Sequence, residues 1–224
     1  MSLSIRVFAE FLGTAVLVTA VIGSGLLGQS LSEDNGVVLL LNHIATILAL
    51  AVLVGLLLPI SGAQINPAVT LVMLLTKRLG WADGLLYVVV QLAGGVLGAV
   101  VAQAMFERPL LEISTNDRIG SGTFVGEVVA TAGLVALILT ALYQDRTLWL
   151  PWLVPAWIGT AFFFTSSTSF ANPAVTVGRM FSDSFTGIAP ASAPGFVLAQ
   201  LLGAVLAIGL VVPFERAYRE RKSN

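Results

Sequence analysis

The chain has no cysteine and a single histidine, His43. Without cysteine there is no disulfide, thiolate metal site or cysteine nucleophile, and one histidine cannot form a histidine cluster. Charged residues are scarce as well: they make up 10% of the 224 residues, whereas a soluble domain carries about a quarter. The net charge of −1 leaves no excess of basic residues for nucleic acid. We therefore expect no nucleic-acid partner, no bound metal and no cofactor.

Apolar residues dominate the chain and are grouped in long runs. They account for 57% of the sequence, and the mean hydropathy is +0.94. Six runs reach the roughly 20 residues that a helix needs to cross a bilayer. These runs are Ile5–Leu27, Val37–Leu58, Leu85–Phe106, Thr123–Tyr143, Leu148–Thr165 and Pro194–Pro213. The fold class predicted from them is an all-α integral membrane protein, which has the lipid bilayer as its surroundings.

The lysines and arginines that flank these runs predict the orientation. Eight of them fall on one side of the membrane: Arg6, Lys77, Arg78, Arg146, Arg216, Arg219, Arg221 and Lys222. Three fall on the other side: Arg108, Arg118 and Arg179. Because the side richer in basic residues is normally cytoplasmic, we expect both termini to lie in the cytoplasm.

The two halves of the chain repeat each other. "AEFLGTAVLV" corresponds to "GEVVATAGLV", and "QLAGGVLGAV" corresponds to "QLLGAVLAIG". The paired residues are Glu10 with Glu127, Asn66 with Asn172, and Gln91 with Gln200. We predict a single domain over residues 1–224, with halves of approximately 1–110 and 120–224. Each half has three spans, an odd number, so the halves must be inverted, and the functional site is expected at the midplane where they meet.

Two copies of Asn-Pro-Ala lie in apolar segments that are too short to cross the membrane and return. They are Asn66-Pro67-Ala68 and Asn172-Pro173-Ala174. Proline suits the first position of a helix, and asparagine is a favoured N-cap. We predict that each copy starts a re-entrant half-helix, preceded by extended chain at Ser61–Ile65 and Ser166–Ala171 that supplies a ladder of carbonyl acceptors.

Half-helices that start at the midplane from opposite faces bring their positive ends together. Each end carries about half an elementary charge, which repels cations and protons. The amides of Asn66 and Asn172 are then expected to aim at a passing oxygen atom. Such a site fits a single file of small neutral hydroxylated molecules.

These motifs resemble those of the major intrinsic protein family, the aquaporins and aquaglyceroporins. The resemblance rests on "AEFLGT", "SGAQINPAVTL", the second Asn-Pro-Ala and the paired glutamates, and it covers essentially the whole chain. It implies a bundle of six transmembrane helices plus two re-entrant half-helices, and a homotetramer with one pore per subunit. It also implies a passive channel for water or small uncharged solutes, and not an enzyme.

The sequence departs from the family at the selectivity filter. Most members have arginine directly after the second Asn-Pro-Ala, where this chain has Val175. Aligned without gaps, the other filter positions are Thr46, Thr160 and Ser169. A gap of one residue would put Gly159 or Phe170 in place of the last two. Water-selective members have a large aromatic residue, histidine and arginine at these positions, and glycerol facilitators have an aspartate where this chain has Thr176. We therefore expect a wide, uncharged filter.

The stretches "TSSTSFANPAVTVGRMFSD" and "FTGIAPASAPGFVLAQ" resemble a bacterial subgroup associated with arsenic-resistance operons. That resemblance implies passage of arsenite, which is the neutral polyol-like As(OH)3 at neutral pH, and of methylated arsenicals. Glycerol-like solutes and water would pass as well. It further implies a location in the bacterial inner membrane.

Four ionisable residues keep two interpretations each. The glutamates Glu10 and Glu127 either brace the re-entrant loops or relay protons, since a charged group within a span is usually functional. His43 is either a packed residue or a pH-sensitive gate. Arg179 is either an interface residue whose side chain snorkels or part of an outer ring that repels cations.

Other functions stay open as alternatives. A water-selective aquaporin has the same architecture. An ion-coupled secondary transporter also uses inverted repeats and half-helices, but it needs a cation site with anionic or carbonyl ligands at the midplane. An intramembrane enzyme needs a nucleophile paired with a base, and the sequence shows no such pair.

Overall fold

The computed structural model describes residues 1–223, and within them there is helix, turn and loop but no β-strand. Its long helices are α1 (Leu3–Leu31), α2 (Asn35–Ser61), α4 (Trp81–Met105), α5 (Ser121–Tyr143), α6 (Leu150–Phe164) and α8 (Ala193–Ser223). A short 3₁₀ turn, η1 (Thr147–Trp149), leads into α6. Counted with this turn, the six helices are long and apolar enough to cross a membrane, as the sequence predicts.

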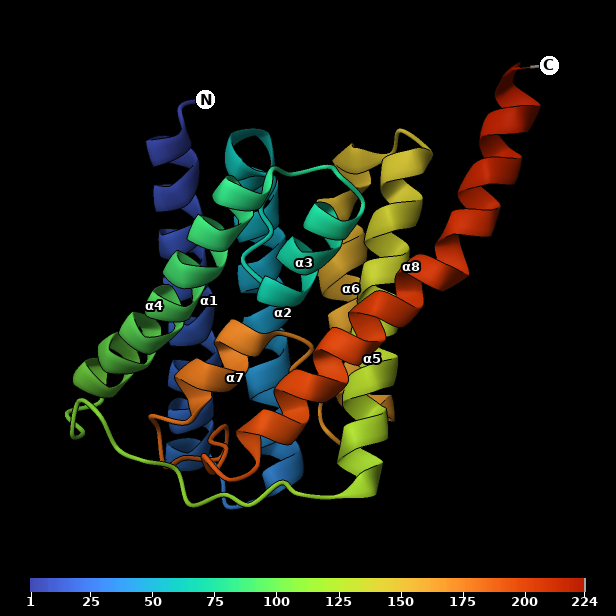
Figure 1. Ribbon diagram of the computed structural model, residues 1–224. Helices are drawn as coiled ribbons and strands as arrows, with labels where there is room; N and C mark the ends of the chain where they lie inside the picture. The colour runs from blue at the N-terminus through green and yellow to red at the C-terminus, as the bar shows by residue number, and fades with distance from the viewer. Residues whose placement is uncertain (224) are drawn as a thin grey trace.

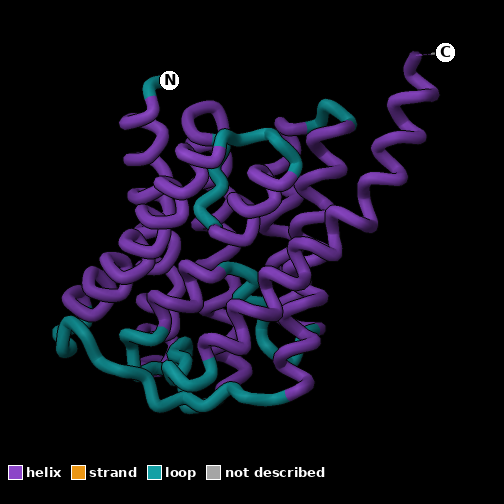
Figure 2. The backbone as a smooth tube through the Cα atoms, in the orientation of Figure 1, coloured by secondary structure: helices purple, strands orange, loops and turns teal. Residues whose placement is uncertain are grey.

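Two short helices lie inside the bundle, namely α3 (Pro67–Leu75) and α7 (Pro173–Arg179). They start near the middle of the molecule and run toward opposite ends (Figure 1). Loops reach the start of each one from the bundle ends, as Figure 2 shows in teal. Both helices begin at the proline of an Asn-Pro-Ala copy, so the predicted starts of the half-helices are correct.

Glycines allow the helices to cross closely. A Cβ atom added to Gly95 of α4 would lie 2.5 Å from the Ala174 carbonyl oxygen of α7, and one added to Gly178 would lie 2.5 Å from the Gly95 carbonyl oxygen. Gly94 meets the backbone of α1 in the same way, and Gly203 of α8 meets the backbone of α5. Small residues of this kind let helix backbones approach in membrane proteins.

The last helix is longer than predicted. The sequence ends the final span at Pro213, but α8 continues through this proline to Ser223. Proline removes one backbone hydrogen bond and tends to kink a helix, and α8 is seen to bend toward its C-terminal end (Figure 1). Contacts with the bundle support the extension, because Glu215 accepts from Arg78 and Lys222 pairs with Asp145 at 2.9 Å.

The two termini lie at the same end of the bundle, here called the inner end (Figure 1). The connection between α4 and α5 lies at the opposite end, here called the outer end. Six spans require this arrangement, since an even number of crossings returns the chain to its starting side.

The close crossing of α4 and α7 makes a prediction about stability. We expect Gly95→Ala to lower the stability by about 2 kcal/mol, because the added methyl group overlaps a backbone oxygen that cannot rotate away. Gly209→Ala in α8 is the matched control, since an added Cβ atom there meets nothing within 4 Å. The measurement is the midpoint of thermal unfolding of the purified proteins in detergent. Equal midpoints for the two variants would contradict the packing argument.

Candidate pore

One cavity of about 360 Å³ follows the half-helices through the middle of the bundle. Its lining includes Arg78 near the inner end, Asn66 and Asn172 at the centre, and Arg179 near the outer end. The cavity thus includes the asparagine of each Asn-Pro-Ala motif.

The two asparagines join the halves of the molecule. Each caps its own half-helix: the Asn66 side chain accepts from the Ala68 N–H, and the Asn172 side chain accepts from the Ala174 N–H. Each also donates across the centre, from Asn66 Nδ2 to the Ala171 carbonyl at 2.7 Å and from Asn172 Nδ2 to the Ile65 carbonyl at 2.9 Å.

These cross-links correct part of the sequence prediction. We expected both amides to aim at a passing oxygen atom, but one N–H of each amide is occupied by the opposite loop. Among the described residues, the second N–H of each amide has no protein acceptor. A solute at the centre therefore meets one donor from each asparagine.

The carboxylate of Glu10 holds the loop that leads to α3. Glu10 is fully buried, and it accepts hydrogen bonds from Ser61 Oγ at 2.6 Å, the Gln64 N–H at 3.0 Å and the Ile65 N–H at 2.5 Å. Two consecutive backbone N–H groups thus converge on one carboxylate, an arrangement known as an anion-binding nest. Glu10 is therefore placed as the bracing interpretation requires.

Glu127 holds the other loop in the same manner. It is also fully buried, and it accepts from the Phe170 N–H at 2.8 Å and the Ala171 N–H at 2.9 Å. The glutamine of each half completes the site: Gln91 Nε2 donates to Glu10 at 2.8 Å, and Gln200 Nε2 donates to Glu127 at 2.6 Å. The residues paired in the sequence repeat thus make matching contacts in space.

The loops are not extended, contrary to the prediction. Backbone φ is positive at Ala63 and Ile65 in the first loop, and at Thr168, Ser169 and Ala171 in the second. The nest requires this departure, because alternating left- and right-handed residues turn successive N–H groups to one side.

The carbonyl ladder is nevertheless compatible with this geometry. The N–H and C=O of a trans peptide point in opposite directions. Since the N–H groups of Gln64 and Ile65 point at Glu10, the carbonyls of Ala63 and Gln64 point away from it, and both residues line the cavity.

The structure places three of the four filter candidates on the cavity wall: Thr46, Ser169 and Val175. Thr46 Oγ1 and Ser169 Oγ are buried and have no hydrogen-bond partner among the described residues. The same is true of Gln64 Oε1, a cavity residue that the sequence analysis did not single out. Three residues of the cavity wall thus carry a buried oxygen atom that has no protein partner among the described residues.

The fourth candidate, Thr160, does not face the cavity, and neither does its alternative Gly159. Thr160 is exposed on α6, donates to the carbonyl of Ala156 at 2.8 Å, and does not line the cavity. Successive helical residues differ in direction by about 100°, so a side chain two positions away points roughly to the opposite face. Ile158 and Phe162 form the cavity wall on this helix instead. Ser169 and its alternative Phe170 both line the cavity.

His43 lies outside the cavity lining. Its ring packs against Phe162 and Phe163, with centroid distances of 5.6 and 4.8 Å, and its Nδ1 has no hydrogen-bond partner among the described residues. An added Cβ atom at Gly159 would come within 3.2 Å of the His43 ring, so Gly159 leaves room for it. These contacts are those of a packed residue.

Arg179 is not a snorkelling residue. Its side chain is only 3% exposed and lines the cavity, with Cζ 3.4 Å from the centroid of the Phe170 ring. The interface interpretation of Arg179 is therefore wrong. Its spacing of four residues from Val175 placed it on the right face of α7, but its burial depends on Phe170 and on the loop beyond α7, which spacing does not reveal.

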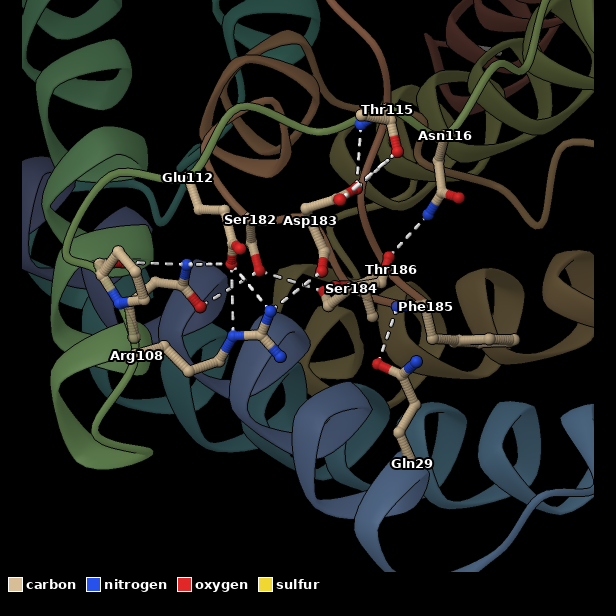
Figure 3. A network of polar contacts seen from close by, with 12 residues as sticks. Gln29, Arg108, Glu112, Thr115, Asn116, Ser182, Asp183, Ser184, Phe185 and Thr186 are labelled. Atoms are coloured by element: carbon tan, nitrogen blue, oxygen red, sulfur yellow. Dashed lines mark hydrogen bonds and ion pairs between the residues drawn. The ribbon is translucent and has the colours of Figure 1, made fainter.

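Two loops pack against each other around the outer end of the cavity. Side chains of the α4–α5 loop bind the loop that follows α7, for example Asn116 Nδ2 to the Ser184 carbonyl at 2.6 Å and Thr115 N–H to Asp183 at 2.8 Å (Figure 3). Arg118 donates to the carbonyls of Gly187 and Phe185, both at 2.8 Å. Burial lowers the pKa of the Arg118 guanidinium from its usual value, and the charge of Glu127 opposes this shift.

Comparison with known proteins identifies the family. The family model described as "Major intrinsic protein" matches residues 1–169, which is most of the chain. The chain belongs to the major intrinsic protein family. The matched residues include the first Asn-Pro-Ala, and the second copy lies just beyond them. The family consists of passive channels for small neutral solutes, and this chain is one of them.

Individual relatives agree with this assignment. The chain is 48% identical to aquaglyceroporin AqpS of Rhizobium meliloti (strain 1021) over 206 residues, covering 92% of this chain and 88% of that protein. It is 31% identical to aquaporin C of Dictyostelium discoideum, covering 80% of this chain and 70% of that protein. The fold also matches the solved aquaglyceroporin of Plasmodium falciparum with a TM-score of 0.71 at 20% identity, covering 96% of this chain and all of that chain.

The hydrogen bonds of Glu10 make a prediction about assembly. We expect Glu10→Ala to be largely lost from the membrane, because it leaves buried donors unpaired at a cost of roughly 1–3 kcal/mol each. Glu112→Ala is the control, since this carboxylate lies half-exposed in the outer loop. The measurement is the yield of monodisperse protein in size-exclusion chromatography. A normal yield combined with lost transport would instead favour the proton-relay interpretation.

Proposed function

We propose that this channel passes glycerol-like solutes and the neutral arsenicals, namely arsenite and methylated arsenicals, in addition to water. The observation that carries the proposal is Val175, which is buried and lines the cavity where most family members have arginine. Valine is shorter than arginine and uncharged, so it leaves the pore wider at this level.

The polar groups of the wall suit a molecule with several hydroxyls. Thr46 and Ser169 line the cavity and have buried hydroxyl groups without protein partners among the described residues, which a change of rotamer turns toward a solute, and Ile158, Phe162 and Val175 supply an apolar surface. Arsenite as As(OH)3 has three hydroxyl groups and no charge, as a small polyol has. The likeness to aquaglyceroporin AqpS supports the same class of solute.

We further propose the setting in which the channel works. It lies in the bacterial inner membrane with its inner end and both termini in the cytoplasm, as the distribution of lysine and arginine indicates. It assembles as a homotetramer in which each subunit forms its own pore. Its 224 residues form one channel domain of two inverted halves, and it catalyses no reaction.

Val175→Arg tests the solute class. We expect arginine to narrow the pore and to reduce the flux of glycerol, arsenite and methylarsenicals about tenfold. Water flux should fall less than about threefold, because water is the smallest of the four solutes and passes the narrowest pore. The measurement is solute-driven swelling of proteoliposomes, with side-by-side rates for the four solutes.

Val175→Leu is the matched control for that experiment, because leucine adds bulk without charge. We expect it to reduce the flux of the larger solutes only slightly. Equal losses for all four solutes in Val175→Arg would show that Val175 is not a selectivity residue, and uptake that depended on an ion gradient would contradict a passive pore.

A further inference from the structure

The outer end of the cavity contains an unneutralised arginine that the family's filter position does not explain. Arg179 follows Val175 by one helical turn, and helical side chains tilt toward the start of their helix. The guanidinium of Arg179 accordingly lies over Phe170, which precedes α7 in the chain. A long side chain anchored one turn farther out thus reaches back along the wall of the cavity.

The hydrogen bonding of Arg179 is incomplete. Nε donates to the Thr186 carbonyl, and among the described residues this is the only hydrogen bond of the guanidinium. The two terminal nitrogens, with four N–H bonds, have no protein acceptor there. Because Arg179 is 97% buried yet lines the cavity, these donors are left for whatever occupies the cavity.

The charge of Arg179 is also incompletely balanced. A second guanidinium, that of Arg118, lies 5.3 Å from the same Phe170 ring. Among the described residues neither arginine forms an ion pair with an acid. The buried carboxylate near them is Glu127, which already accepts from the backbone N–H groups of Phe170 and Ala171. Two guanidinium groups therefore face one carboxylate at the outer end.

The inverted repeat has an uncharged residue at the inner position that corresponds to Arg179. Asn66 and Asn172 differ by 106 positions, so Val175 corresponds to Val69 and Arg179 to Met73. All four residues line the cavity. The inner half has an apolar methionine where the outer half has an arginine.

We propose that Arg179 is the specificity-determining residue at the outer end of the pore. Its charge excludes cations, and its free N–H donors receive the oxygen atoms of neutral polyhydroxylated solutes. Phe170 holds the guanidinium against the wall by a cation–π contact, and the Thr186 carbonyl fixes its direction. Val175, one turn nearer the centre, then leaves width for a solute larger than water. This inference deepens the proposed function and rests on it for the solute class, but not for cation exclusion.

The test compares Arg179→Ala and Arg179→Lys with wild type in proteoliposomes. Proton and potassium leak are followed with entrapped pH- and potassium-sensitive dyes, and water and glycerol flux are followed by swelling. We expect Arg179→Ala to raise the cation leak at least tenfold with water flux retained, and to lower the preference for glycerol over a linear apolar-tailed alcohol of similar size. Arg179→Lys should restore cation exclusion, because it keeps the charge.

Arg146→Ala is the matched control. Arg146 also stacks on an aromatic ring, with Cζ 5.6 Å from the centroid of a Trp149 ring, but it lies near the inner end and does not line the cavity. It should leave both the leak and the solute preference at wild-type values. If Arg179→Ala does not assemble, Phe170→Leu serves in its place, since it removes the support of the guanidinium while keeping its charge, and it should alter the solute preference.

Each result decides the question. Wild-type cation exclusion and solute preference in Arg179→Ala would overturn the proposal. A cation leak in Arg179→Lys as large as that in Arg179→Ala would overturn it as well. If Phe170→Leu has to replace Arg179→Ala, an unchanged solute preference in that variant would overturn it too. Failure of the proposed function is separate: wild-type vesicles would then swell with water but not with glycerol or arsenite, while the difference in cation leak between variants would persist.

Discussion

The fold depends on a buried carboxylate that binds two consecutive backbone N–H groups. A chain that enters the membrane without helical hydrogen bonding leaves backbone groups that the bilayer cannot satisfy. Glu10 and Glu127 solve this problem once in each half, and a glutamine from the following span holds each carboxylate in place. The same contacts turn the opposite carbonyls toward the cavity. One interaction thus allows both the re-entrant loop and the polar wall of the pore.

The reciprocal hydrogen bonds of the asparagines connect the two halves. Asn66 reaches a carbonyl of the second loop and Asn172 reaches a carbonyl of the first, so neither half-helix is positioned without the other. Each part of the amide thus has its own partner. The oxygen caps a helix, one N–H donates to the opposite loop, and the other N–H has no protein acceptor among the described residues. The contacts at the centre of the pore are therefore nearly symmetric.

The symmetry ends at the mouths. The inner half has Met73 where the outer half has Arg179, and at the outer end the α4–α5 loop is hydrogen-bonded to the loop that follows α7 (Figure 3). A symmetric centre suits passage in either direction, as a passive channel requires. In the proposal made above, Arg179 distinguishes solutes at a position where the repeat has diverged.

The sequence by itself determined the spans, the starts of both half-helices and the pairing of Glu10 with Glu127, because each depends on local composition, on capping by Asn-Pro or on the repeat. Other features were decided only by the tertiary structure. Thr160 faces away from the cavity because it lies two residues from Ile158 and Phe162, and residues two positions apart in a helix differ in direction by about 200°. Arg179 is buried because Phe170 and Thr186 pack against it. Each asparagine donates a hydrogen bond to the opposite loop because two loops more than 100 residues apart in the chain lie side by side. Such contacts depend on how separate segments pack, which local patterns do not encode.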